Sequence, residues 1–352
     1  MNKKLIALAV AGACVAPAAM AQTANPVTLY GQVNVMLESV EAKGGATPVS
    51  RRTRIEDQSS RLGVRGTEDI GGGLKAFFQL ETAFRPDQNN TTFAARNSAV
   101  GLQGGFGSIL IGRWDMPFKS AAIAIDPYGD IMISGITGVL SDRGNFDRRD
   151  QNVLEYWTPT WGGFAMRFAA TANENKSATA NPRDMGASAT YSGGPVYAFL
   201  AWEQHKDNNN GNALAPGGAG TVAGYKEDGY ALGGSVTFGP VKIGAQGQEF
   251  KKTGRTKQKS YMVNGTFTAG NNQFIAQFMN SKDGQANGAA APKCDSWSVA
   301  YKYNFSRRTS FIGSYVKVDN NSNATCNFGS NTLTIAAGQD PQGAYVGFLH
   351  NF

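Results

Sequence analysis

The chain has 352 residues, a formal net charge of +7 and 44 glycines. Beyond residue 21, no apolar run reaches the ~20 residues that a helix needs to cross a membrane, which argues against a protein built on membrane-spanning helices. No run of Lys or Arg exceeds two residues, so no arm that binds nucleic acid is expected and no nucleic-acid partner is predicted.

Residues 1–21 have the pattern of a signal peptide that is removed on export. Lys3 and Lys4 precede a short apolar core, and residues 19–21 (AMA) form a small-x-small cleavage site. The apolar core is too short for a membrane-spanning helix. The mature chain, residues 22–352, is predicted to form a single domain.

Segments of alternating apolar and polar residues recur along the mature chain. Val27–Glu38 and Asp295–Phe305 are the clearest examples. A period of two indicates β-strands whose two faces meet different surroundings. Short turns rich in Gly or Pro alternate with longer polar connections, and counting between them gives about 16 strands. The pattern predicts an all-β fold, a 16-stranded antiparallel transmembrane β-barrel. The longer connections are expected at residues 39–59, 85–91, 115–148, 172–185, 206–227, 252–257, 282–294 and 320–342.

The last ten residues, Gly343–Phe352, alternate in the same way. A strand at the end of the chain needs a partner, and in a closed barrel that partner is the first strand, here Val27–Glu38. Phe352 is therefore predicted to be needed for assembly of the barrel.

Aromatic residues gather beside the short turns, as they do in the interfacial girdle of an outer-membrane barrel. They are Trp161, Phe164, Tyr191, Tyr197, Phe238, Phe267, Phe305 and Phe311. In a soluble β-sandwich, the alternative fold, these rings would fill a core. A sandwich does not need so many polar residues on the inward face of its strands.

The connection from Asp115 to Arg148 is the longest and contains two apolar stretches. An extracellular loop this apolar is predicted to fold back into the barrel and to narrow the lumen. There it would hold Asp126 and Asp130 against the facing wall. The alternative is an ordinary surface loop.

Arginines recur on the strands that would face this loop. They are Arg61 and Arg65 in the second strand, Arg96 at the start of the fourth, Arg113 at the end of the fifth and Arg149 at the start of the sixth. Cations opposite carboxylates across a narrow water column create a strong transverse field, and rings of such charges set the ion selectivity of a pore. The alternative is that they are solvated lumen charges without a role in a constriction.

Two cysteines, Cys294 and Cys326, remain after export and fall at consecutive long connections. An even number of cysteines in an exported chain is typical of disulfides, so these two are predicted to be bonded.

Little in the sequence indicates catalysis. The two histidines are His205, expected at the start of a loop and solvated, and His350, on the outer face of the terminal strand. Neither has a neighbouring catalytic partner, and no Cys or His cluster has metal-ligand spacing. No cofactor or metal site is predicted.

Several stretches resemble the trimeric general porins of Gram-negative outer membranes, in particular their beta-proteobacterial branch. They are residues 27–31 (VTLYG), 59–69 (SSRLGVRGTED), 96–113 (RNSAVGLQGGFGSILIGR), 149–159 (RDQNVLEYWTP) and 347–352 (GFLHNF).

The resemblance implies sixteen strands, a homotrimer and a third extracellular loop folded into the lumen. It places constriction arginines at Arg61, Arg96 and Arg149, and it makes Phe352 part of the signal read by the insertion machinery. One departure concerns the third loop, where Asp126-Pro127-Tyr128-Gly129-Asp130 replaces the usual Pro-Glu-Phe-Gly-Gly type of motif.

The sequence thus predicts a passive, water-filled outer-membrane channel for small hydrophilic solutes and ions, with a preference for anions. The expected surroundings are outer-membrane lipid and lipopolysaccharide. Two alternatives stay open, a solute-specific channel and an outer-membrane barrel enzyme, and the enzymes resemble smaller barrels of about 10 to 12 strands. The small residues of the strand from Arg96 to Gly104 are expected to face outward and to form an oligomer interface.

Overall fold

The computed structural model describes residues 27–45, 47–88, 90–129, 132–140, 145–208, 221–282 and 291–352. The predicted signal peptide and Asp130 lie outside the described residues. Within these ranges, no helix is long and apolar enough to cross a membrane.

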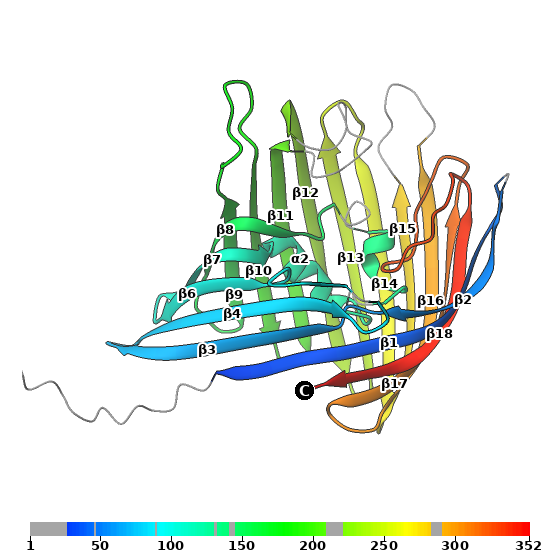
Figure 1. Ribbon diagram of the computed structural model, residues 1–352, viewed down its shortest axis with the longest axis horizontal. Helices are drawn as coiled ribbons and strands as arrows, with labels where there is room; N and C mark the ends of the chain where they lie inside the picture. The colour runs from blue at the N-terminus through cyan, green and yellow to red at the C-terminus, as the bar shows by residue number, and fades with distance from the viewer. Residues whose placement is uncertain are drawn as a thin grey trace, which may run out of the picture.

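The described chain forms one antiparallel sheet that curves around helix α2, Pro117–Ala122 (Figure 1). The strand segments are β1 (Thr28–Lys43), β2 (Val49–Asp57), β3 (Arg61–Gly71), β4 (Leu74–Arg85), β5 (Asn90–Thr92), β6 (Ser98–Gly104), β7 (Gly107–Asp115), β8 (Arg149–Trp157), β9 (Phe164–Thr171), β10 (Arg183–Gly193), β11 (Val196–Asn208), β12 (Thr221–Phe238), β13 (Val241–Lys252), β14 (Gln258–Ala269), β15 (Asn272–Lys282), β16 (Lys293–Asn304), β17 (Thr309–Asn320) and β18 (Asp340–Asn351).

These eighteen described segments make sixteen barrel strands. β2 and β3 pair with successive parts of β1, so together they form one strand, interrupted near Ser59. β5 and β6 pair with successive parts of β4 in the same way, interrupted near Ala94. Ser59 and Ala94 both have positive φ angles, which breaks the regular ladder at these two points. The predicted strand number is confirmed.

The barrel closes between its first and last strands. β1 pairs with β18 from Gln32 opposite Asn351 to Lys43 opposite Asp340. Beyond that ladder, Gly31 and Phe352 exchange two backbone hydrogen bonds of 3.1 Å each. The predicted pairing of the terminal segment with Val27–Glu38 is therefore confirmed. The connection expected at residues 39–59 is much shorter than predicted, because β1 continues to Lys43 and β2 begins at Val49.

Side chains alternate between the outer face and the interior of the barrel. Leu200 and Leu232 on the outer face are 58% and 62% exposed, whereas Phe199 and Ala231 beside them are buried. The strand from Ser98 departs from the prediction, since Ala99 is buried and Val100 and Leu102 are exposed. The prediction assumes that Arg96 follows the same inward and outward alternation as this strand, but Arg96 precedes β6 and does not share its alternation.

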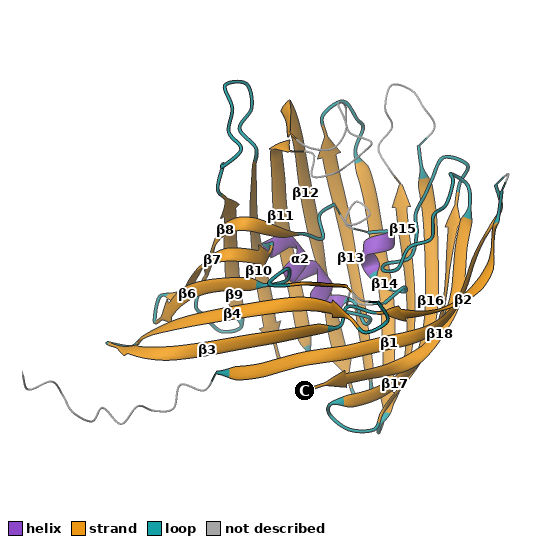
Figure 2. Cartoon of the chain, in the orientation of Figure 1, coloured by secondary structure: helices purple, strands orange, loops and turns teal. Residues whose placement is uncertain are grey.

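The loop between β7 and β8 lies inside the barrel and packs on part of its wall. Helix α2 and the 3-10 turns η1 (Ile123–Ile125) and η2 (Ile136–Gly138) carry its apolar side chains. Phe118, Ile125 and Phe146 pack with inward residues of the wall such as Phe250 and Met262. Figure 2 shows α2 enclosed by the curve of the sheet. The predicted inward fold of this loop is confirmed.

Tyr197, predicted to lie in the girdle, points inward instead. Its hydroxyl donates a hydrogen bond of 3.0 Å to the carbonyl oxygen of Ala121 in the loop. Trp161, Phe164, Phe238, Phe267 and Phe305 remain exposed on the outer face, as a girdle requires.

The connection between β17 and β18 also turns inward and fastens the loop. Thr137 Oγ1 donates to the carbonyl oxygen of Gly329 at 2.6 Å, and the Gly329 amide donates to the carbonyl oxygen of Ile133 at 3.0 Å. Cys294 and Cys326 form the predicted disulfide, with Cα atoms 6.3 Å apart, which ties this connection to β16.

We expect mass spectrometry of unreduced peptides to recover Cys294 and Cys326 in one linked species. Replacing both by serine should lower the free energy of unfolding by about 2–4 kcal/mol, because the closed chain segment gains freedom when unfolded. Two free thiols in protein taken from the membrane would contradict the assignment.

Candidate functional site

A polar cavity of about 270 Å³ lies between the barrel wall and the inward loop. It is lined by Ser59, Arg61, Glu81, Arg96, Asn97, Asp115, Lys119, Ile123, Gly129 and Arg149. The wall side comes from β3, β4, β7 and β8 and from the short segments before β3 and β6, and the loop side comes from α2 and the residues after it. The structure thus brings Arg61, Arg96 and Arg149 to one place.

Two of these arginines are held by carboxylates of the wall. Arg96 Nε donates to Glu81 Oε1 at 2.5 Å. Arg149 forms an ion pair of 2.9 Å with Asp115, and its Nε donates to Asn97 Oδ1 at 2.6 Å. Such charge-assisted bonds fix the guanidinium planes in the wall. Among the described residues, Arg61 makes no ion pair, although it lies within electrostatic range of Arg96, Glu81 and Arg149.

The cavity carries an excess of positive charge. Among the described residues, four cationic side chains line it, Arg61, Arg96, Lys119 and Arg149, against two carboxylates, Glu81 and Asp115. The excess is therefore two positive charges. Because the surroundings are partly closed to water, these charges act through a lower effective dielectric than in bulk solution and their field is correspondingly stronger.

Lys119 places a cation on the loop side, where the sequence predicted acids. It forms ion pairs of 3.1 Å with Asp147 and 3.7 Å with Asp115. It thereby links helix α2 both to the strand before the loop and to the end of the loop.

Arg65 lies on the same wall, in β3, but does not line the cavity. Its guanidinium is 5.0 Å from the centre of the Tyr30 ring, and the Tyr30 hydroxyl donates to Glu81 Oε2 at 3.0 Å. The Tyr30 ring lies flat on β3 over Gly63, where a Cβ atom would approach Tyr30 Cζ to 2.3 Å. Glycine is therefore required at this position.

Arg113 borders a neighbouring cavity of about 290 Å³, which Arg148, Arg149 and Arg183 also line. Its Nε donates to the carbonyl oxygen of Ala95 at 2.7 Å. Arg148 lies outside the strands, and the nearby carboxylates of Asp150 and Asp184 raise its pKa further above its ordinary value although burial opposes them. The cationic strip thus extends along the wall beyond the first cavity.

Asp126 does not line either cavity. It is 8% exposed, its Oδ1 accepts a hydrogen bond of 3.0 Å from the Tyr128 amide, and its Oδ2 accepts one of 3.3 Å from the Ile136 amide. In this position it holds the loop in shape. The predicted partner Asp130 is not among the described residues. Among the described residues, the carboxylates beside the arginines are Glu81 and Asp115. Both belong to the wall itself, and neither was predicted from the sequence as a site residue.

His205 is buried, and the expectation of a solvated loop residue was wrong because β11 continues to Asn208. Its two ring nitrogens lie 2.8 Å from Glu203 Oε1 and 3.1 Å from Glu227 Oε2, and its ring stacks on Phe146 at 4.4 Å. It therefore anchors the returning arm of the loop. In the described chain no three His, Cys, Asp or Glu side chains gather as a metal site.

Comparison with known proteins gives a consistent result. The sequence profile of the family described as Gram-negative porin matches residues 7–323. Outer membrane porin protein 32 of Delftia acidovorans is 31% identical over the full length of both chains. The structure of an anion-selective porin from Comamonas acidovorans superposes with a TM-score of 0.78 at 28% identity, covering 93% of this chain and 99% of that one. The trimer form of OmpT of Vibrio cholerae shares the fold, with a TM-score of 0.67 at 17% identity over 93% of this chain and 99% of that one.

Proposed function

The chain belongs to the Gram-negative porin family and is a β-barrel channel of the outer membrane, and on this basis we propose that the cavity around Arg61, Arg96 and Arg149 is a constriction that makes the channel prefer anions. Its relatives are named as porins, which are channels, so the alternative of an outer-membrane enzyme is set aside.

The excess of cationic side chains in the cavity is the observation that carries this proposal. Counting the described residues, an anion that enters meets two more positive than negative charges, whereas a cation meets repulsion from the same groups. The similar structure is named as an anion-selective porin, which agrees with this direction.

The cavity favours general diffusion over a solute-specific channel. In the described part of the chain, its lining is charged or small and polar apart from Ile123 and Gly129, and no aromatic ring lines it. A dedicated solute site normally combines apolar or aromatic walls with a few placed polar groups. We therefore propose that small hydrophilic solutes and ions pass by sieving and electrostatic steering, without turnover.

We also propose that residues 1–21 are removed on export and that three copies of the mature chain form a homotrimer. The exposed aliphatic face of the early strands, including Leu62, Leu80, Val100 and Ile111, is the candidate interface. The remaining outer wall would meet outer-membrane lipid, including lipopolysaccharide.

Proteoliposomes that contain the purified porin should admit a small carboxylate faster than an ammonium compound of the same size. Lowering the salt from 1 M to 0.1 M should widen the difference, because the screening length grows from about 3 Å to about 10 Å. Equal rates at 0.1 M would mean that the cavity does not sort solutes by charge.

A further inference from the structure

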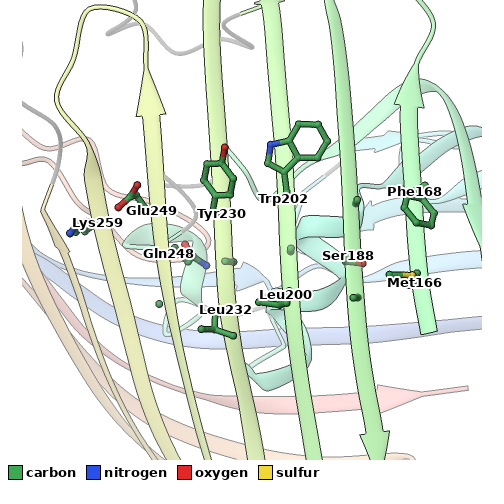
Figure 3. Close-up of a pocket in the computed structure, with 15 residues that line it drawn as sticks. Met166, Phe168, Ser188, Leu200, Trp202, Tyr230, Leu232, Gln248, Glu249 and Lys259 are labelled. Carbon is green, nitrogen blue, oxygen red and sulfur yellow. The ribbon is translucent and has the colours of Figure 1, made fainter. Parts of the chain in front are cut away.

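A groove of about 690 Å³ opens on the outer face of the barrel, across strands β9 to β14 (Figure 3). Small residues form its floor, among them Ala187, Ala189 and Gly247. Met166 and Phe168 bound it on one side, and Leu200 and Leu232 project from its middle. Neither the channel nor its constriction uses this groove, because it faces away from the lumen.

The end of the groove away from the short turns reaches a polar boundary. Trp202 stands opposite Tyr230, which stands opposite Glu249. One step further from the short turns, Asp228 stands opposite Lys251, whose Nζ lies 5.0 Å from the centre of the Tyr230 ring. Trp and Tyr side chains next to a row of charged residues mark the level in the membrane where the hydrocarbon gives way to the lipid headgroups.

A row of three lysines continues this level around the barrel. Lys259 of β14 stands opposite Lys282 of β15, and Lys282 stands opposite Lys293 of β16. All three are exposed and share the outer face with lipid-side residues such as Tyr261. Like charges directly opposite each other on neighbouring strands destabilise a sheet. The row is therefore expected to have an anionic partner.

Among the described residues, only Lys293 of this row forms an ion pair. Lys293 lies 3.6 Å from Asp295. Glu249 stands opposite Lys259 on the neighbouring strand but is shared with Lys257 at 2.8 Å and Lys251 at 3.9 Å. Within the ranges that the structure describes, Lys259 and Lys282 form no ion pair. At the centre of the row, Lys282 therefore has no carboxylate within ion-pair distance among the described residues.

We propose that this face binds an outer-leaflet lipid that carries more than one phosphate, the chemistry of lipopolysaccharide. An acyl chain occupies the groove along Leu200 and Leu232, and the phosphates lie on Lys259 and Lys282. Neighbouring strands are about 4.8 Å apart, so the row spans about 10 Å and can engage two phosphates at once. The inference rests on the proposed contact with lipopolysaccharide and adds the site and the groups that recognise it.

A second copy of this chain is the less suitable occupant. A protein interface of this kind disfavours lysine at its core, whereas this face combines an apolar groove with an exposed lysine row. The aliphatic face proposed for the trimer belongs to the early strands, and Figure 1 shows strands β3 and β4 on the opposite side of the barrel from β11 to β13.

The test is native mass spectrometry of the intact, folded porin in detergent, titrated with a bisphosphorylated glucosamine lipid. Its dephosphorylated form, a zwitterionic phospholipid and inorganic phosphate serve as competing probes. We expect the porin to retain the bisphosphorylated lipid tightly and to retain none of the other three probes. The triple variant Lys259→Gln/Lys282→Gln/Lys293→Gln should lose at least 10-fold in affinity.

A second variant tests the groove independently of charge. Gly247→Phe should also weaken binding, since a Cβ atom there meets nothing within 4 Å and the added ring would occupy the groove without disturbing the barrel. Lys75→Gln/Lys242→Gln, beside the short turns at the other end of the barrel, is the matched control and should bind normally.

Equal affinity for the phosphorylated and dephosphorylated lipids, or unchanged binding by the triple variant, would overturn the proposal. Full competition by inorganic phosphate would also overturn it, because the site would then hold free anions and not a lipid. Association of chains that Gly247→Phe abolishes would assign the groove to a second copy. Ion selectivity of the triple variant, measured in parallel, should be unchanged, which separates a failure here from a failure of the proposed channel mechanism.

Discussion

Replacing Arg61, Arg96 and Arg149 together by glutamine is expected to move the zero-current potential of the channel from anion preference to cation preference. Of the four cations that line the cavity in the described part of the chain, Lys119 alone would remain, against the carboxylates of Glu81 and Asp115. The local balance thus changes from an excess of two positive charges to an excess of one negative charge.

The expected effect is large. A unit charge about 5 Å from an ion contributes roughly 1–3 kcal/mol at effective dielectric constants between 80 and 20, and about 1.4 kcal/mol corresponds to a factor of ten. The ratio of anion to cation permeability in 0.1 M salt should therefore fall at least about 10-fold.

The control is the corresponding triple lysine variant, which keeps the charge but loses the planar, two-pronged hydrogen bonding of arginine. It should retain the sign of the preference. Both variants should still run as folded barrels on unheated gels. If the glutamine variant keeps the wild-type potential, selectivity arises elsewhere along the pore.

Deleting Phe352 is expected to reduce the amount of folded porin in the outer membrane severalfold or more. Phe352 exchanges two backbone hydrogen bonds with Gly31. Its ring lies over that glycine, where a Cβ atom would approach Phe352 Cζ to 2.4 Å. The deletion removes the last pairing between the terminal segment and the first strand.

Two variants separate the ring from the chain end. Phe352→Tyr keeps both the backbone pair and the ring and should assemble almost normally. Phe352→Ala keeps the backbone pair with Gly31 but removes the ring, so it should assemble less well. The measurement is the heat-modifiable band in purified outer membranes. Normal amounts after deletion of Phe352 would show that closure does not depend on it.

The barrel could be predicted from the sequence because its cause is local. Apolar and polar residues alternate along each strand, and the short turns between strands carry glycine or proline. The number of strands can therefore be counted from the sequence, and closure of the barrel follows from the terminal strand. Prediction failed where the ladder is interrupted. Arg96 lies in the irregular segment between β5 and β6, so the alternation of β6 does not extend back to it, and the face predicted for Ala99 from Arg96 was wrong.

The arginines of the cavity could be predicted, but their partners could not. Arg61, Arg96 and Arg149 stand out as cations on strands that also resemble a known family. Glu81 and Asp115 meet the arginines through contacts between residues 15 or more positions apart, such as the bond between Arg96 and Glu81. Spacing along one chain does not reveal such contacts.

The contacts that hold the inward loop in place could not be predicted from the sequence either. His205 and Phe146 stack although 59 positions separate them, and Gly329 holds the loop from a connection expected to lie outside. These contacts depend on how far β11 extends and where two loops meet inside the barrel. Neither is encoded in a local pattern of alternation.

The most direct test of a positively charged constriction is the zero-current potential of single wild-type channels across a tenfold gradient of potassium chloride, with the concentrated side at 0.1 M. Chloride and potassium have nearly equal mobilities, so any potential reports the protein. The predicted result is a potential whose sign shows that chloride crosses faster than potassium. Its size should fall when the salt on both sides is raised toward 1 M. A potential of the opposite sign, or none at low salt, would contradict the assignment of the cavity around Arg61, Arg96 and Arg149.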